Sequence, residues 1–378
     1  MKYYLIAGER SGDLHGGNLI RAISQIDTEA EFRGFGGDLM EEAGMQVAVH
    51  YRAMAFMGLL AVVIHARTIL QRLKYCQSDI LAFHPDVVIL IDYGGFNRKV
   101  AAFCKRKGVR VFYYISPKVW AWYPRRALEL KRHVDRMFCI LPFEQDFYKK
   151  YAWDVDYVGN PVLDAVKAFA ERRDRQQPAY LQAGEDRPAK ERTVALLPGS
   201  RTHELDRIIP LMVKVVKFFP DYTFVVAAVS SVSPACYQPF ASVANVKVVF
   251  DATYDLLSGA HAAIVTSGTA TLETALFKVP QVVVYKASWL EFFVARRVLS
   301  VPFVSLVNLI ANREVIRELL QEQATVSNVK EELQSLLAES PYRNEMLAAY
   351  DELFQKLDVG SASANAARLM VSYLTASA

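Results

Sequence analysis

The sequence predicts two α/β domains in tandem, each built on a doubly wound parallel sheet. Short apolar runs alternate with amphipathic stretches in the first half of the chain, and a second series of the same kind begins after residue 192. Runs that are apolar throughout are typical of parallel strands buried on both faces. A length of 378 residues also favours two hydrophobic cores over one.

The first domain is expected at residues 1–167. A helix is expected at Asp13–Ile26, after the first strand. The four apolar runs that predict its strands are Tyr3–Ala7, Asp86–Asp92, Val109–Ile115 and Arg136–Leu141.

Residues 168–192 are rich in charge, proline and glutamine, which favours an interdomain linker. The second domain is expected at 193–340. Its predicted strands are Thr193–Leu197, Tyr222–Ala228, Val246–Phe250, Ala262–Val265 and Gln281–Tyr285. The tail at 341–378 has a helical pattern, and in tandem folds of this type such helices can cross back to the first domain.

The composition is that of a globular protein, with 52% hydrophobic and 22% charged residues. A net charge of +4 permits a nucleic acid or anionic lipid partner without selecting either. No signal-peptide pattern opens the chain. The longest apolar run, 53–64, is shorter than the roughly 20 residues that span a bilayer. The four cysteines form no CxxC pair, which favours a reducing, cytoplasmic location.

The first candidate site follows the first predicted strand. Its glycines allow a sharp turn, and the helix that begins there offers free N–H groups to an anion. The spacing is not that of a dinucleotide fingerprint. The alternative is an ordinary capped turn, with Ser11 or Asp13 as N-cap. The candidate residues of this loop are Gly8, Glu9, Ser11, Gly12 and Asp13.

The second candidate is Asp92, at the carboxyl end of a predicted strand, where ligand sites of open α/β sheets gather. A carboxylate at the edge of an apolar core is expected to have a raised pKa, as a general base requires. The alternative is an N-cap for a helix that begins near Asn97.

Two further turns lie in the second domain. Gly199, Ser200 and Arg201 follow its first strand and suit the oxygens of a diphosphate. A second turn of small residues comprises Ser267, Gly268 and Thr269, and Glu273 follows one helical turn later.

A glutamate in that place can accept hydrogen bonds from the two hydroxyls of a ribose. Together the two turns predict a nucleoside diphosphate site. The alternatives are a capped turn with a surface arginine for the first and a capping box for the second.

The amphipathic stretch 56–73 carries apolar residues beside cations, as membrane-surface helices do. Phe56, Met57, Leu60 and Val63 are its candidate membrane or acyl-chain contacts. A helix buried on two sides is the alternative. Aromatic and cationic residues also alternate at 116–126, which favours a sugar or a membrane surface over a nucleobase.

Seven segments carry a resemblance to a known family. In chain order they are AGERSGD, LIDYGGFN, YYISPKVWAW, LPFEQDFY, LLPGSR, SGTATLE and SLVNLIANRE. This ordered set, from Ala7 to about Glu322, resembles the lipid-A-disaccharide synthases. The resemblance implies a GT-B fold, in which two Rossmann-like domains flank a cleft.

The resemblance also implies a reaction. The family joins UDP-2,3-diacylglucosamine to 2,3-diacylglucosamine 1-phosphate through a β-1′,6 linkage, releases UDP, and uses neither metal nor cofactor. It works as a peripheral protein on the inner face of the inner membrane. By motif, Asp92 corresponds to an essential carboxylate and Arg201 to an essential arginine. Glu9, Ser11, Ser267, Thr269, Glu273 and Asn308 fall on site positions.

Two positions depart from the family pattern. Gly95 stands where many members have a second acid, which strengthens the assignment of Asp92. Lys118 stands where serine is usual, and it adds a cation that suits the acceptor phosphate. A homodimer remains open. The competing interpretations are another UDP-N-acetylglucosamine enzyme, namely a 2-epimerase or the peptidoglycan glucosaminyl transferase, and a non-catalytic membrane-surface nucleotide sensor.

Overall fold

The computed structural model describes residues 1–53, 66–173, 193–287 and 301–376. The chain divides into two compact units. Unit 1 comprises Met1–Pro161 and Asp358–Ala378, and unit 2 comprises Val162–Leu357. The boundary predicted after residue 167 therefore falls inside a helix, α9 (Pro161–Arg173), most of which belongs to unit 2.

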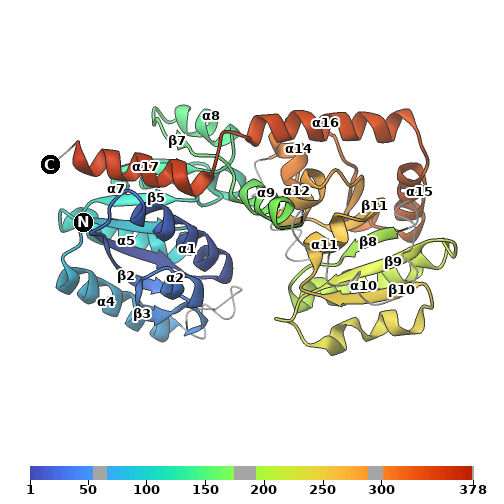
Figure 1. The fold of residues 1–378 in the computed structure, drawn as a ribbon, viewed down its shortest axis with the longest axis horizontal. Coiled ribbons are helices and arrows are strands. Elements are labelled where there is room, and N and C mark those ends of the chain that lie inside the picture. Colours follow the sequence, from blue (N-terminus) through green and yellow to red (C-terminus); the bar gives the residue numbers. More distant parts are fainter. Residues whose placement is uncertain (54–65, 174–192, 288–300, 377–378) are drawn as a thin grey trace. The chain divides into compact units, whose positions relative to one another are not determined.

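Unit 1 contains a parallel sheet of seven strands in the order β3-β2-β1-β4-β5-β6-β7 (Figure 1). The chain starts in the middle of this sheet, builds one side, and then crosses to the other side at the β1/β4 pair. Such a reversal is the topological switch point of a doubly wound fold. The strands are β1 (Lys2–Ala7), β2 (Glu31–Gly36), β3 (Gln46–His50), β4 (Val87–Ile91), β5 (Val111–Tyr114), β6 (Arg136–Cys139) and β7 (Asp156–Tyr157).

Helices cover both faces of this sheet, and a separate apolar core lies on each face. Alternate residues of β1 enter the two cores: Tyr4 and Ile6 enter one, and Tyr3 and Leu5 enter the other. The helices of unit 1 are α1 (Arg10–Ser24), α2 (Asp38–Glu42), α4 (Ala66–Phe83), α5 (Gly94–Arg106), α6 (Val119–Trp122), α7 (Arg126–His133), α8 (Phe143–Lys149) and α17 (Ala362–Thr375).

The C-terminal helix α17 packs beside α1 in unit 1 (Figure 1). Ala366, Met370 and Leu374 are buried in the same core as β1. Polar contacts fix the two ends of the helix, because Asn365 Nδ2 donates to the carbonyl of Val158 (3.2 Å) and Tyr373 Oη donates to Asp156 (3.1 Å). The last helix is therefore an integral part of the first unit.

Unit 2 contains a parallel sheet of six strands in the order β10-β9-β8-β11-β12-β13. Here the switch point is the β8/β11 pair. All of these strands except β13 were predicted from the sequence. The strands are β8 (Thr193–Leu197), β9 (Thr223–Ala228), β10 (Val246–Phe250), β11 (Ala262–Thr266), β12 (Gln281–Tyr285) and β13 (Glu318–Leu320).

The helices of unit 2 again follow the strands in alternation. Beside α9, they are α10 (Thr202–Val216), α11 (Thr253–Leu257), α12 (Thr269–Leu276), α14 (Leu306–Ala311), α15 (Val326–Leu337) and α16 (Pro341–Leu357). Short 3₁₀ turns occupy Pro234–Ser242 and Gln321–Gln323. The helical tail that the sequence predicted at 341–378 begins with α16, which belongs to this unit.

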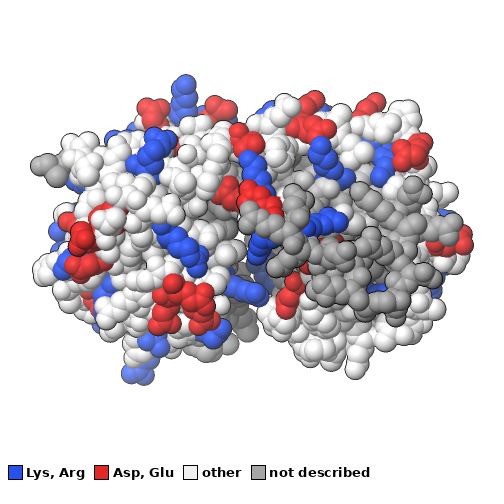
Figure 2. Space-filling model, viewed as in Figure 1, with Lys and Arg blue, Asp and Glu red and all other residues white. Residues whose placement is uncertain are grey.

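The surface of the described residues has no strongly basic face in the view of Figure 2, where lysine and arginine alternate with acidic side chains. Among the described helices, none combines the length and the apolar character needed to cross a bilayer. Among the described residues, Cys76, Cys104 and Cys139 are buried free thiols, whereas Cys236 is only half-buried.

Candidate active site

The switch point of unit 1 brings the first loop and Asp92 together. Strands β1 and β4 are paired in parallel, with Ala7 beside Ile91, so their carboxyl ends lie next to each other. Glu9 follows β1 as the N-cap of α1, and its side chain makes no capping hydrogen bond. Asp92 follows β4. Two residues that are far apart in the sequence are therefore neighbours at the edge of one sheet, as expected for ligand sites in this fold.

The chain turns sharply after β4. Both Asp92 and Tyr93 adopt left-handed backbone conformations, with φ of 44° and 47°. For residues other than glycine this conformation costs roughly 1–2 kcal/mol each, and such strain gathers at functional sites. The turn also explains Gly8, because a Cβ at that position would collide with the ring of Tyr93. Helix α5 begins at Gly94 with Tyr93 as N-cap, so the alternative of Asp92 as N-cap does not hold.

Burial raises the pKa of Asp92. The positive charge of Lys118 opposes this rise, and the negative charge of Glu9 reinforces it. The raised pKa that the sequence predicted for a base at this place is therefore found. Lys118 itself is exposed, in the loop between β5 and α6. Asp92, Glu9 and Lys118 thus form one group of interacting charges.

A buried glutamate that no predicted site included holds the loop that carries Lys118. Glu144 Oε1 accepts a hydrogen bond from Trp120 Nε1 (3.0 Å), and Oε2 accepts from the backbone N–H of Leu141 (3.0 Å). Burial raises its pKa to about 7. The only sequence signals for this contact were two family segments, YYISPKVWAW and LPFEQDFY, which contain Trp120 and Glu144.

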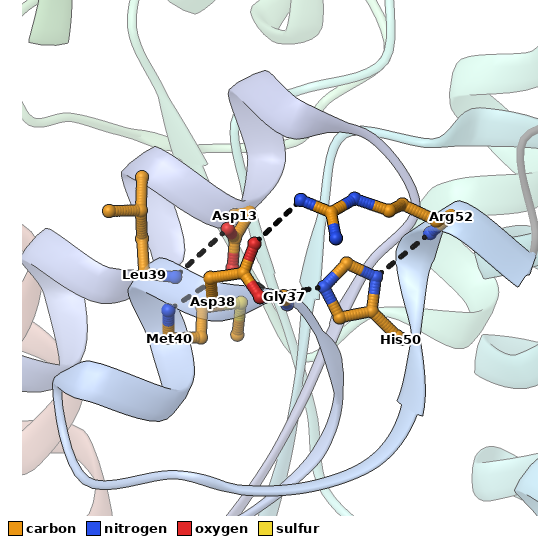
Figure 3. A network of polar contacts seen from close by, with 7 residues as sticks. All are labelled: Asp13, Gly37, Asp38, Leu39, Met40, His50 and Arg52. Carbon is orange, nitrogen blue, oxygen red and sulfur yellow. Dashed lines mark hydrogen bonds and ion pairs between the residues drawn. The ribbon is translucent and has the colours of Figure 1, made fainter.

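The other residues of the first loop divide into two groups. Ser11 is exposed in the first turn of α1, and Gly12 is buried against Ala7. Asp13 is 2% exposed, and its carboxylate accepts hydrogen bonds from the backbone N–H groups at the start of α2 (Figure 3). These donors are Gly37 (2.7 Å), Leu39 (3.2 Å) and Met40 (3.1 Å). Asp13 therefore joins α1 to α2, which gives this side chain a structural role.

The switch point of unit 2 brings the two predicted anion turns together. Leu197 at the end of β8 is paired with Val265 near the end of β11. In the first turn, Gly199 has φ of 109°, and a Cβ there would lie 2.7 Å from Glu204 Oε2. Ser200 is exposed, and Arg201 is the N-cap residue of α10. The side chain of Arg201 is 52% exposed, and its guanidinium pairs with Glu204 (3.1 Å).

The second turn opens α12, with Gly268 as N-cap and Thr269 exposed at the first helical position. Ser267 Oγ donates to the carbonyl of Val304 (3.2 Å), so this hydroxyl ties the turn to the segment before α14. No side chain caps α12. Helices α10 and α12 therefore begin at neighbouring strand ends. The backbone N–H groups of their first turns are suited to bind a diphosphate.

Glu273 lies one turn into α12 and is held by a tyrosine from α11. Tyr254 Oη donates to Glu273 Oε1 at 2.9 Å. Burial raises the pKa of Glu273, and the hydrogen bond from Tyr254 opposes this rise. The carboxylate does not form the capping box that was the alternative for this segment. Tyr254 was not singled out in the sequence, because nothing local connects it to Glu273.

Asn308 is fully buried, and both its side-chain oxygen and its side-chain nitrogen form hydrogen bonds with other groups of the protein. Its Oδ1 accepts from the backbone N–H groups of Val315 (2.8 Å) and Ile316 (3.0 Å). Its Nδ2 donates to the carbonyl of Ile316 (2.9 Å) and to Glu318 Oε1 (2.9 Å). Glu318 in turn accepts from the N–H of Ser305 (2.9 Å). Asn308 therefore holds the segment that contacts Ser267, and the described contacts give it a structural role.

The four predicted membrane contacts, Phe56, Met57, Leu60 and Val63, lie outside the described residues. The amphipathic stretch that contained them ends inside α4, which begins at Ala66.

Comparison with known proteins decides the family. Residues 3–370 match the model of the lipid-A-disaccharide synthetase family. The chain belongs to this family. It is 35% identical to the lipid-A-disaccharide synthase of Geobacter metallireducens, over 98% of this chain and 96% of that protein. It is 36% identical to that of Syntrophus aciditrophicus, over 96% and 95%. Membership makes the chain a glycosyltransferase of lipid A biosynthesis, and neither competing interpretation is favoured.

Solved structures with the same fold include glycosyltransferases and 2-epimerases. The UDP-GlcNAc 2-epimerase of Neisseria meningitidis, bound to UDP-GlcNAc, superposes with a TM-score of 0.70 over 100% of both chains at 13% identity. The calicheamicin glycosyltransferase CalG4 gives a TM-score of 0.63 at 15% identity, over 100% and 99% of the two chains. At these identities the likeness shows the fold alone, which is GT-B as the sequence predicted.

Proposed function

We propose that this chain transfers 2,3-diacylglucosamine from its UDP ester to 2,3-diacylglucosamine 1-phosphate. The products are the lipid A disaccharide 1-phosphate and UDP. Family membership supports this reaction. The observation that carries it furthest is the pair of switch points: one has a carboxylate with a raised pKa, and the other has two helix N-termini beside Arg201.

Asp92 is the general base of this reaction. A carboxylate oxygen of Asp92 takes the proton of the acceptor 6-hydroxyl, and the 6-oxygen of the acceptor attacks the anomeric carbon of the donor. The bond from that carbon to the UDP oxygen breaks in the same displacement. An α-linked donor therefore gives a β-linked product. Burial supports the assignment, because a base with a raised pKa accepts a proton more readily at neutral pH.

The leaving UDP is stabilised in unit 2. Arg201 and the backbone N–H groups at the starts of α10 and α12 neutralise the charge that develops on the diphosphate. Glu273 accepts hydrogen bonds from the ribose hydroxyls. Lys118 and Glu9 lie near Asp92 and orient the acceptor, with Lys118 suited to its phosphate. Removal of one electrostatic donor of the kind that Arg201 represents costs on the order of 10²- to 10³-fold in rate.

The test is a thin-layer assay with UDP-2,3-diacylglucosamine and radiolabelled 2,3-diacylglucosamine 1-phosphate in detergent, with EDTA present. A disaccharide 1-phosphate is expected from the wild type and not from Asp92→Asn. Asp156→Asn is a matched control, because burial also raises the pKa of Asp156 but its partner is Tyr373. Full turnover in Asp92→Asn would refute the assignment of Asp92 as the general base. If the wild type forms no product, the proposed acceptor is wrong.

Both substrates carry acyl chains, so we place the enzyme on the cytoplasmic face of the inner membrane as a peripheral protein. The amphipathic sequence at 56–73 supports this location. Serine at Met57 and Leu60 together is expected to weaken sedimentation with liposomes while the thermal unfolding midpoint stays unchanged. Equal sedimentation of variant and wild type would remove the support for this segment as the membrane contact.

A further inference from the structure

The backbone of Asp92 is fixed by two side chains that the proposed reaction does not use. The hydroxyl of Tyr113 donates to the carbonyl oxygen of Asp92 at 2.5 Å. Asn97 Nδ2 donates to the same oxygen at 2.9 Å. Asn97 also reaches the carbonyl of Ile91, at 3.3 Å. The two donors come from different elements, because Tyr113 is in β5 and Asn97 is in the first turns of α5.

Both donors are rigidly placed. Tyr113 and Asn97 are fully buried. Burial, and the nearby charge of Asp92, raise the pKa of Tyr113, so its hydroxyl remains protonated and able to donate. On the other side of residue 92, the N–H of Asp92 donates to the carbonyl of Tyr114 (3.2 Å). The peptide groups on both sides of Asp92 are therefore held by β5 and α5.

This restraint matters because residue 92 is not in a relaxed conformation. A left-handed φ of 44° at Asp92, followed by 47° at Tyr93, is disfavoured for both residues. In the described chain the two hydrogen bonds onto the Asp92 carbonyl oppose relaxation toward an extended strand end. The backbone angles of residue 92 set the direction in which its carboxylate leaves the chain.

We propose that Tyr113 and Asn97 are positioning residues that hold the Asp92 carboxylate in its reactive orientation. The proposal rests on the proposed role of Asp92 as base. Neither side chain touches substrate in this proposal. Each acts through the backbone of Asp92, and loss of either lets the carboxylate swing away from the acceptor hydroxyl and toward solvent.

A purely structural role predicts something different. Two buried hydrogen bonds also stabilise the fold, and their loss would lower the unfolding temperature without a specific effect on the folded enzyme. The unit provides a matched control. Tyr4 is likewise fully buried, in β1 on the other side of β4, and its hydroxyl donates to Asp79 at 2.7 Å in a contact that does not involve Asp92.

The experiment compares Tyr113→Phe, Asn97→Ala, their double variant and Tyr4→Phe with the wild type, in the disaccharide assay across a range of pH. We expect kcat to fall about 10-fold in Tyr113→Phe and in Asn97→Ala, with KM within about twofold. The acid limb of the kcat profile moves to lower pH, because a more solvated carboxylate loses part of its raised pKa. The other titratable groups at this site are Glu9, Tyr93 and Lys118.

The double variant is expected to lose less than the product of the two single effects, because both act on one carbonyl. Tyr4→Phe keeps the wild-type kcat and pH profile at a similar loss of thermal stability. If Tyr113→Phe and Asn97→Ala both match Tyr4→Phe in kcat and in the acid limb while Asp92→Asn is inactive, the positioning role is overturned. The assignment of Asp92 as the base then still stands. If Asp92→Asn is fully active, the base assignment fails and the positioning role fails with it.

Discussion

Tyr254 Oη lies 2.9 Å from Glu273 Oε1, and this hydrogen bond connects α11 to the second anion turn of unit 2. The ring of Tyr254 is itself fixed between two phenylalanines, Phe169 and Phe277, at centroid distances of 5.6 and 5.2 Å. The hydroxyl therefore approaches Glu273 from a fixed direction. One oxygen of the carboxylate is occupied, and the hydrogen bond sets the orientation of the whole group that we propose to bind a ribose.

We expect Tyr254→Phe to weaken the binding of UDP by roughly 5- to 10-fold, because Glu273 then loses the donor that orients it. Isothermal titration with UDP measures the effect. Tyr342→Phe is the matched control, since Tyr342 also donates to a glutamate, Glu332, elsewhere in unit 2. An equal loss of UDP affinity in both variants would contradict a specific role for Tyr254.

Arg201 is half-exposed and held only by Glu204 within the described contacts, so its guanidinium is available to a diphosphate. We expect Arg201→Ala to lower kcat by about 10²- to 10³-fold and Arg201→Lys to restore only part of it, since lysine lacks the planar pair of donors. The assay is disaccharide formation at saturating UDP-sugar.

Arg313→Ala controls for loss of an exposed arginine in the same unit, because Arg313 pairs with Glu352 on the surface. Turnover in Arg201→Ala equal to that of the control would remove Arg201 from the diphosphate site.

Much of the fold was predictable because its central strands are apolar on both faces. β4 reads VVILI and β8 reads TVALL, and both are fully buried. The strands that escaped prediction, β2, β3, β7 and β13, lie at or next to a sheet edge. β2, with the sequence EFRGFG, contains two charged residues and two glycines, and β7 has only two residues. Such segments form strands because a neighbour supplies hydrogen bonds, which no local pattern reveals.

The turns of the candidate site were predictable for a related reason: each directly follows a recognisable strand. Their partners were not. Glu144 and Trp120 are 24 residues apart, and Tyr254 and Glu273 are 19 apart. Side-chain pairs at such separations depend on how the helices pack. Asp13 illustrates the limit, because its place in a predicted loop was evident but its three backbone donors at α2 were not.

Asn308 falls on a family site position, and the question is whether it binds the nucleotide directly or only stabilises the fold. Its four hydrogen bonds close the loop between α14 and β13, and alanine would leave several buried polar groups unpaired. We expect Asn308→Ala to destabilise the protein by about 3 kcal/mol. Chemical denaturation measures this loss, and titration with UDP at low temperature measures binding by the folded fraction.

Asn245→Ala offers a comparison, because Asn245 also donates to two backbone carbonyls in unit 2. A variant at Asn308 that is as stable as the wild type but no longer binds UDP would show direct contact with the nucleotide instead.

The raised pKa of Asp92 also predicts how stability depends on pH. Burial favours the protonated carboxyl in the folded state, relative to the ordinary value of 3.8. Asp92 therefore contributes its full stability below that value, and the contribution is lost as pH rises through the folded-state pKa. Near neutral pH the ionised group destabilises the fold, and asparagine removes that charge.

We expect Asp92→Asn to unfold at a higher temperature than the wild type near neutral pH, and the difference to shrink as the pH falls toward the ordinary carboxyl value of 3.8. Thermal unfolding followed by circular dichroism at several pH values measures it. If the variant loses turnover and gains stability in this pH-dependent manner, the ionised carboxylate is needed for the reaction and at the same time destabilises the folded protein. A constant difference at all pH values would instead mean that the substitution changes packing, and that ionisation of Asp92 is not what opposes folding at this turn.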